Sequence, residues 1–164
     1  MTRTATLETP RVDYSIRERR QMIALLSSRL AESLDLGLQV RHAQWNVSGV
    51  RFSALHELFG RLHADLDRYA DVLAERVVQL GGSVNGTKWA VIDESHLAVY
   101  PTSIEGAGHA AAVAAALASW SSILHPLIDL AGGLNDPMTT DILTEVARGV
   151  DNWQWLVAAN VSRT

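Results

Sequence analysis

The sequence contains no cysteine, and this absence removes several kinds of chemistry at once. Without thiols the chain can form no disulfide framework, no thiolate zinc site and no thiol nucleophile, so a bound metal would need nitrogen and oxygen ligands. Lysine is almost absent too, because Lys88 is the only one among 14 basic residues, and the formal net charge is -4. That balance disfavours a surface built to coat the phosphate backbone of nucleic acid.

The chain also lacks a clear targeting or membrane segment. Residues 1–14 mix basic and acidic side chains without an apolar run, unlike a signal or transit peptide. The longest uncharged stretch, between Glu105 and Asp129, is long enough to span a bilayer but consists largely of Ala, Ser and Gly and contains Pro126. We therefore expect a buried helix, no membrane association and a cytoplasmic location.

The composition is that of one folded domain. A chain of 164 residues with 48% hydrophobic residues can build one full core. No alternating strand pattern, glycine-rich phosphate-binding motif or internal repeat is present. We expect a flexible N-terminal tail over residues 1–14 and a single domain over residues 15–164.

Helical periodicity covers the first half of the domain. Ser15 and Glu18 form a capping-box pattern, and apolar residues then recur at helical spacing until the sequence VSG at 47–49. A second helical pattern runs over 52–80 and ends at two glycines, 81–82. The stretch 81–101 follows as a long connection with one short helix around 89–92.

Two further long helices are expected in the second half. Thr102 and Glu105 resemble a capping box that opens the third, and Pro126 is expected to kink or interrupt it. Asp136 and Pro137 read as the cap and first residue of a fourth helix ending near Asn160. The prediction is all-α: a four-helix bundle with a long crossover between its second and third helices, an architecture that does not define a function.

Five polar residues form one stripe on the second helix, away from its apolar face: His56, His63, Asp67, Asp71 and Glu75. A solvated helix face is the simplest interpretation. A metal site is the other, since Asp71 and Glu75 stand one turn apart and carboxylates suit ferrous iron. His56 cannot join them within one chain, because 19 residues of helix separate it from Glu75 by about 28 Å.

A second copy of the chain would solve this problem of distance. If two such helices crossed antiparallel near residues 65 and 66, position 56 would face the partner's position 75 and position 60 would face position 71, giving two identical sites. The usual arrangement inside one subunit uses Glu-x-x-His, and none of the eight glutamates is followed by histidine at that spacing. The metal interpretation that remains is a site shared between two chains.

Several motifs match one known family when taken together: QWNVSG at 44–49, FSALHE at 52–57, DVLAERVVQLGG at 71–82, YP at 100–101 and TDILT at 140–144. They resemble the Dps family of ferritin-related proteins. The resemblance implies a ferritin-like subunit in a hollow homododecamer that oxidises Fe2+, preferentially with hydrogen peroxide, stores Fe3+ and limits oxidative damage. It also implies ferroxidase sites at two-fold interfaces, with Asp71 and Glu75 from one subunit and His56 from its partner.

Two positions depart from the family pattern. Gln44 stands where the family has histidine, and Gly60 where it has aspartate. Either the site is lost, leaving a non-catalytic shell that protects DNA or has a structural role, or the His63 side chain extends into the space above Gly60 and replaces the missing ligand. We favour replacement. Gln44 would then be a weak ligand or would bind a metal-bound water. Added imidazole also suggests zinc competition, or a zinc or other divalent-metal reservoir.

Other residues have weaker expected roles. The resemblance implies that Asp141 lines a three-fold pore and that Glu145 extends it, although acids near a helix start are common without such a role. Asp67 could bond the partner's His63 or face the cavity, and Trp45 could intercept radicals beside the site or pack in the core. The remaining histidines match no ligand position, and we expect structural or surface roles for them: His42, His96, His109 and His125.

Charge predicts weak or absent DNA binding. Residues 1–15 hold two arginines and two acids, and twelve chains would carry a formal charge of about -48. In a gel-shift assay near neutral pH and physiological salt, we therefore expect no tight complex. Submicromolar, salt-sensitive retardation would contradict this, and its loss on changing Arg17, Arg19 and Arg20 to alanine would locate the error in that basic run.

Overall fold

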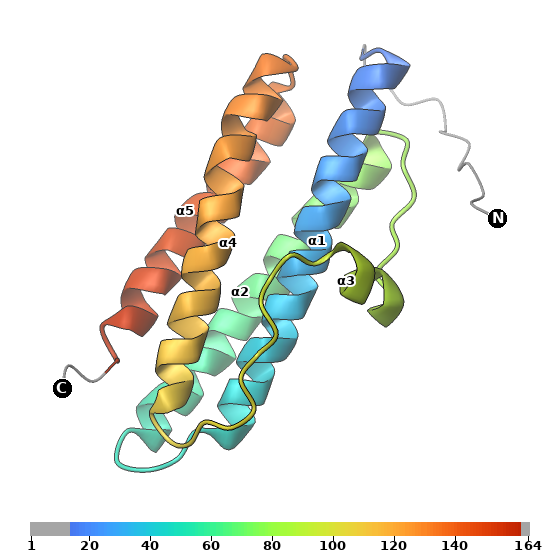
Figure 1. The fold of residues 1–164 in the computed structure, drawn as a ribbon. Coiled ribbons are helices and arrows are strands. Elements are labelled where there is room, and N and C mark those ends of the chain that lie inside the picture. The colour runs from blue at the N-terminus through green and yellow to red at the C-terminus, as the bar shows by residue number, and fades with distance from the viewer. Residues whose placement is uncertain (1–13, 162–164) are drawn as a thin grey trace.

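The computed structural model describes residues 14–161, where all regular secondary structure is helical: α1 (Ile16–Asn46), α2 (Phe52–Gln79), α3 (Lys88–Glu94), α4 (Gly108–Gly133) and α5 (Pro137–Ala158). The antiparallel pair α1 and α2 lies beside the pair α4 and α5 (Figure 1). The segment between α2 and α4 runs down the outer side of α1 and carries α3, so α2 and α4 point the same way. This confirms the predicted bundle and crossover. Most of the predicted tail, residues 1–13, lies outside the described residues.

Local chemistry sets most helix ends where the sequence predicts them. The Ser15 hydroxyl accepts from the Glu18 amide at 3.2 Å, and the Glu18 carboxylate accepts from the Ser15 amide at 2.8 Å, which completes the capping box. Gly81 adopts φ +83° just after α2, a conformation that ends a helix and favours glycine. The Thr87 hydroxyl caps the short α3.

The start of α4 differs from its prediction. The expected capping box at Thr102 and Glu105 does not open a helix, because α4 begins at Gly108 after an N-cap, Ala107, that has no side-chain hydrogen bond. Gly106 adopts φ +54°, which the interior of a right-handed helix cannot contain, so the helix begins beyond it. At the other end, α4 continues through Pro126 to Gly133 without interruption.

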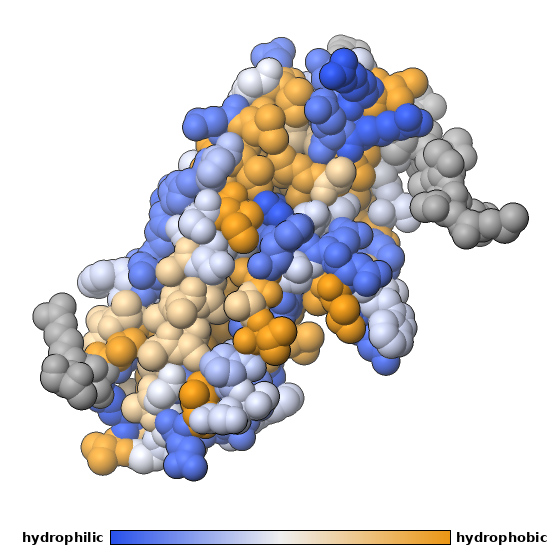
Figure 2. All heavy atoms as spheres, viewed as in Figure 1, coloured by the Kyte–Doolittle hydropathy of each residue, from blue (hydrophilic) through white to orange (hydrophobic). Residues whose placement is uncertain are grey.

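The core lies between the two helix pairs. Fully buried side chains from both pairs include Leu36, Phe59, Leu117 and Trp120. By length and composition, one described helix could cross a membrane, and it is α4. It packs Leu117 and Trp120 into the core, as expected of a bundle helix, and its small apolar residues form the pale band along α4 in Figure 2.

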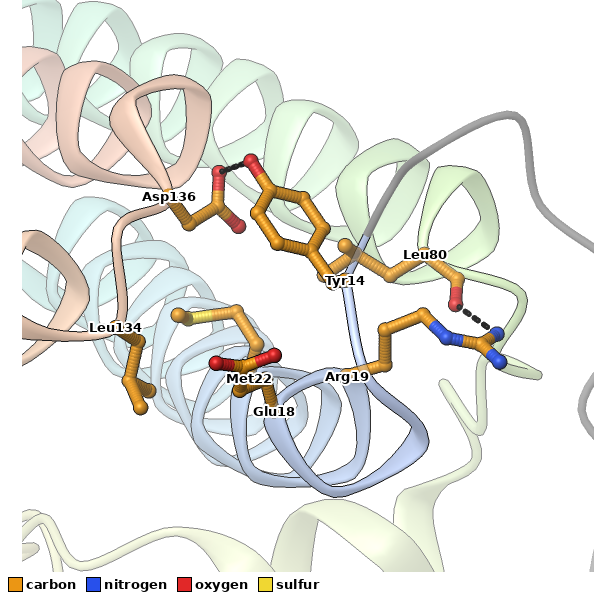
Figure 3. Close-up of a pocket in the computed structure, with 7 residues that line it drawn as sticks. All are labelled: Tyr14, Glu18, Arg19, Met22, Leu80, Leu134 and Asp136. Atoms are coloured by element: carbon orange, nitrogen blue, oxygen red, sulfur yellow. Dashed lines mark hydrogen bonds between the residues drawn. The ribbon is translucent and has the colours of Figure 1, made fainter.

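A buried ion pair joins the start of α5 to α2. Asp136 caps α5 through the Thr139 amide at 3.0 Å and accepts from one Arg76 nitrogen at 2.9 and 3.1 Å. The Tyr14 hydroxyl donates to the same carboxylate at 3.2 Å, which ties the chain before α1 to this cluster (Figure 3). Burial acts to raise the pKa of Asp136, but hydrogen bonds from Thr139 and Arg76 outweigh it, and the pKa is lowered.

The basic run near the start of α1 is only partly solvated. Arg17 and Arg20 are exposed, but Arg19 is buried and donates to the Leu80 carbonyl at 3.4 Å (Figure 3). Arg19 therefore links α1 to the end of α2, unlike its exposed neighbours. Its aliphatic stem allows a guanidinium to reach a carbonyl from a buried position.

The Asp136 cluster predicts a pH-dependent stability. Because folding lowers the pKa of Asp136, its contribution is present above the unfolded pKa of about 3.9 and is lost as pH falls through the lower folded pKa. At neutral pH, Asp136→Asn should reduce the free energy of unfolding by on the order of 3 kcal/mol, since Arg76 loses its buried partner. Chemical denaturation of this variant and of the exposed control Asp129→Asn should show the difference, and equal losses would contradict it.

Candidate metal site

The polar stripe of α2 points away from the bundle core. His56, Asp67, Asp71 and Glu75 are exposed and His63 is half-buried. The opposite side of α2 is packed into the core by a row of leucines: Leu55, Leu62, Leu66 and Leu73. Core packing therefore fixes the rotation of α2 so that the stripe faces outward.

The predicted ligands fall into two separate groups. Within residues 14–161, no group of three or more His, Asp or Glu side chains lies close enough to hold a metal ion. Along α2, His56 and Glu75 are separated by about 28 Å of helix. One half-site is the imidazole end, where His56 and His63 lie beside the end of α1, and the other is the carboxylate end with Asp71 and Glu75.

His56 is oriented by a backbone contact. Its Nδ1 lies 3.1 Å from the Gln44 carbonyl oxygen, which can only accept, so Nδ1 is the donor. This leaves the lone pair on Nε2, the arrangement found in metal-binding histidines whose second nitrogen is anchored. The Phe52 ring lies against the imidazole, with 5.3 Å between centroids. His56 therefore fits the role of a nitrogen ligand from this half-site.

The two departures from the family pattern touch each other. The Gln44 amide donates from Nε2 to the His56 carbonyl at 3.2 Å and lies over Gly60. A Cβ at position 60 would be 2.8 Å from that Nε2, too close to be accommodated without movement of Gln44. No atom of the His63 side chain lies within 4 Å of this position. The space expected for the His63 imidazole is thus filled by Gln44.

Arg41 joins the imidazole half-site, a residue that sequence reasoning missed. It donates from Nη1 to Gln44 Oε1 at 2.9 Å, and its Nη2 lies 3.3 Å from His63 Nδ1. Asp67 Oδ2 lies 3.1 Å from the same nitrogen, so Arg41 and Asp67 compete for it. The i,i+3 spacing places Arg41 and Gln44 on one face of α1, but the reach to α2 depends on helix packing.

The carboxylate half-site borders an apolar depression. Asp71 and Glu75 are both exposed near the end of α2. Glu75 lines a depression of about 410 Å³ together with Val78 and Val84. An exposed carboxylate beside exposed apolar side chains is a surface suited to contact with another chain.

The residues with weaker expected roles, Trp45, Asp141 and Glu145, have different environments in the structure. The Trp45 side chain is 73% exposed, so core packing does not explain it. Asp141 is exposed in the first turns of α5, where a pore role stays a prediction. Glu145 accepts from Arg68 at 2.6 Å, so its carboxylate is already paired with α2.

The other histidines have structural contacts, as expected. His96 contacts Glu32 at 3.2 Å and His125 contacts Asp151 at 3.0 Å. The Tyr100 hydroxyl is 2.7 Å from His109 Nδ1, and the His42 ring lies 5.2 Å from the Tyr100 ring. Burial raises the pKa of Tyr100 to about 12, while burial and then His42 lower the pKa of His109. The pair therefore stays neutral, with Tyr100 as donor.

Known proteins are similar to this chain in fold and in sequence. The ferritin-like domain family matches residues 23–164. The DNA protection during starvation protein of Agrobacterium fabrum is 36% identical over 141 residues, covering 85% of this chain and 87% of that protein. The protein of the same name from Brevibacillus brevis is 29% identical over 150 residues, covering 85% and 94%. Mycobacterium smegmatis Dps has a TM-score of 0.90 at 27% identity, covering 95% of this chain and 96% of that chain.

These matches and the arrangement of the helices define the class of the protein, which is ferritin-like and all-α. Within that class, the chain belongs to the Dps family, as the resemblance of its motifs implied. The family match begins within α1, at residue 23, and extends through α5, so both half-sites lie within the matched region.

The contact between Gln44 and Gly60 can be tested by a double-mutant cycle. Gly60→Ala improves helix propensity but moves the Gln44 amide and so breaks its bond to His56, whereas in a Gln44→Ala background nothing blocks the added methyl group. We expect a coupling of about 1 kcal/mol in the free energy of unfolding, with Gly60→Ala more favourable in the Gln44→Ala background. Additive effects of the two substitutions would contradict the contact.

Proposed function

We propose that this chain forms a shell that binds Fe2+ between two-fold-related α2 helices and oxidises it, preferentially with hydrogen peroxide. The observation that carries the proposal is the division of the α2 stripe. Its imidazole end and its carboxylate end are both presented to solvent, yet they lie too far apart to act together within one chain. Antiparallel pairing of two copies brings each imidazole end against a carboxylate end.

Exposed apolar side chains support assembly of such copies. Leu38 is 66% exposed and, on and near α3, Trp89 is 66%, Ile92 67% and Val99 94% exposed. Leu38, Ile92 and Val99 line one depression of about 390 Å³ between α1 and α3. Burying these side chains against a second copy would stabilise the interface by removing apolar surface from water. A dodecamer is the assembly that the family implies.

Each composite site would divide its work between two chains. His56 Nε2 from one chain and the carboxylates of Asp71 and Glu75 from its partner hold one ferrous ion, a mixed nitrogen and oxygen set that suits this metal. His63 serves a second, transient ion. Two Fe2+ ions together supply two electrons, which reduce one hydrogen peroxide and two protons to two waters and leave two Fe3+ ions. Pairing the electrons avoids release of hydroxyl radical.

Protection of the cell would follow from this removal of iron and peroxide. Ferric product moves into the shell, and Asp141 contributes to an entry pore for Fe2+ on the acidic surface. Glu145 contributes less, because Arg68 already neutralises its carboxylate. Zinc competes for the same site through its affinity for imidazole. The relatives' name refers to DNA protection, and in this chain protection would come from iron chemistry rather than from coating DNA.

Subunit complementation tests the shared site. We expect His56→Ala and Asp71→Ala shells each to lose rapid oxidation of Fe2+ by peroxide, measured by ferric absorbance. When the two variants are unfolded together and reassembled, each mixed pair contains one site with both changes and one intact site. Activity should return to about a quarter of the wild-type value for random mixing.

Controls distinguish this proposal from its alternatives. His63→Ala should slow oxidation substantially, and Gln44→Ala should have a smaller effect. A shell that binds iron but oxidises none of it would favour a non-catalytic shell, and one that binds zinc alone would favour a metal reservoir. Failure of the mixed variants to recover activity, with light scattering showing intact shells, would contradict the shared site. A fully active monomer would contradict the assembly.

A further inference from the structure

One cation holds both side chains that could serve a second metal ion. The Arg41 guanidinium donates to Gln44 Oε1 at 2.9 Å and contacts His63 Nδ1 at 3.3 Å. Gln44 occupies one of the two positions where the family pattern has a ligand, and His63 lies three residues beyond the other, Gly60. Arg41 is half-buried, and it reaches from α1 across to α2.

We infer that Arg41 takes the place of a second ion and limits tight binding to one metal ion per composite site. This inference rests on the proposed function. A guanidinium stays protonated and has five N–H donors but no lone pair, so it cannot coordinate a metal and repels one nearby. In the empty pair of chains, the same charge offsets the partner's carboxylates, because position 60 faces the partner's position 71.

Gln44 cannot easily turn its oxygen toward a metal. Its Oε1 accepts from Arg41, while its Nε2 donates to the His56 carbonyl at 3.2 Å. Rotating the amide by half a turn would set its N–H groups against the Arg41 donors and its oxygen against the carbonyl, so both hydrogen bonds would be lost. Arg41 thus positions Gln44 so that its oxygen is already occupied.

His63 is held in the same way but less firmly. Its Nδ1 lies within reach of both Arg41 and Asp67, at 3.3 and 3.1 Å. When Nδ1 accepts from Arg41, the ring proton is on Nε2 and that nitrogen cannot bind a metal, whereas donation from Nδ1 to Asp67 leaves the lone pair on Nε2. A second ion therefore binds this imidazole only when the guanidinium has been displaced from Nδ1. The first ion is not affected in this manner, because the contact of His56 is with a backbone carbonyl and leaves Nε2 available. Arg41 is therefore a specificity-determining residue for the number of ions, and it touches no reacting atom.

The number of bound ions can be measured by calorimetric titration of the intact shell with Co2+. This ion is chosen because it stays in the divalent state in buffer without peroxide. Wild type should bind roughly one tight ion per chain. Arg41→Gln should bind roughly two, with the second on the order of tenfold tighter than in wild type, because one repelling charge is gone. Arg41→Lys keeps the charge and should resemble wild type. Arg148→Gln removes an exposed arginine from α5 as the matched control and should also resemble wild type.

The outcomes separate this inference from the proposed function. Adding His63→Ala to Arg41→Gln should return the stoichiometry to roughly one, which would locate the second ion at His63. Two tightly bound ions per chain in wild type would overturn the role of Arg41. So would an unchanged stoichiometry in Arg41→Gln, provided that Asp71→Ala abolishes binding of the first ion. Both outcomes would leave the shared site intact. Absence of any tight ion in both wild type and Arg41→Gln would overturn the shared site and this inference together.

Discussion

The stiffness of α2 is the constraint on which the site depends. A continuous helix rises 1.5 Å per residue, so residues spread along one stripe stay apart however their side chains rotate. The leucines on the opposite face fix the rotation of α2 against the core, which fixes the direction of the stripe. His56 and Glu75 can therefore meet only through a second copy of the chain. The hydrophobic core thereby decides which surface is offered to a partner.

The departures from the family pattern form one coupled unit in space. The Gln44 amide occupies the position above Gly60. The absence of a side chain at position 60 is what makes room for it. Arg41 then fixes the amide from the other side. Gln44 thus fits in this position because residue 60 is glycine, since the Cβ of an aspartate there would lie 2.8 Å from Gln44 Nε2.

Much of this fold was predictable because its signals are local. The Ser15 capping box and the Asp136–Pro137 pair mark the starts of α1 and α5, and apolar periodicity indicates which helix faces are buried. The start of α4 was not predictable in this way. A Cβ at Gly106 would lie 3.6 Å from the Ser48 carbonyl, so the turn there is packed against the loop between α1 and α2, and that contact is distant in sequence.

The sequence predicts the positions of the candidate site residues along one helix, but not their contacts with other helices. Helical spacing places His56, Asp71 and Glu75 on an outward stripe, because position on a helix follows from sequence number. The link from Arg41 to His63 spans two helices and depends on their separation. The sequence identifies Asp136 as a helix cap but not its ion pair with Arg76, because that contact also spans two helices.

The interior of the bundle also contains the carboxylate of Glu32, and its hydrogen bonds show that its role is structural. Glu32 is fully buried and accepts from Arg29 at 2.8 Å and from Trp120 at 3.0 Å, while His96 contacts it at 3.2 Å. Burial raises its pKa even though Arg29, His96 and Trp120 act to lower it. Removing it would leave the Arg29 charge buried without its partner, which is strongly destabilising. Glu32 thus ties α1 to α4 and to the crossover, and the proposed metal chemistry falls instead to the outer face of α2.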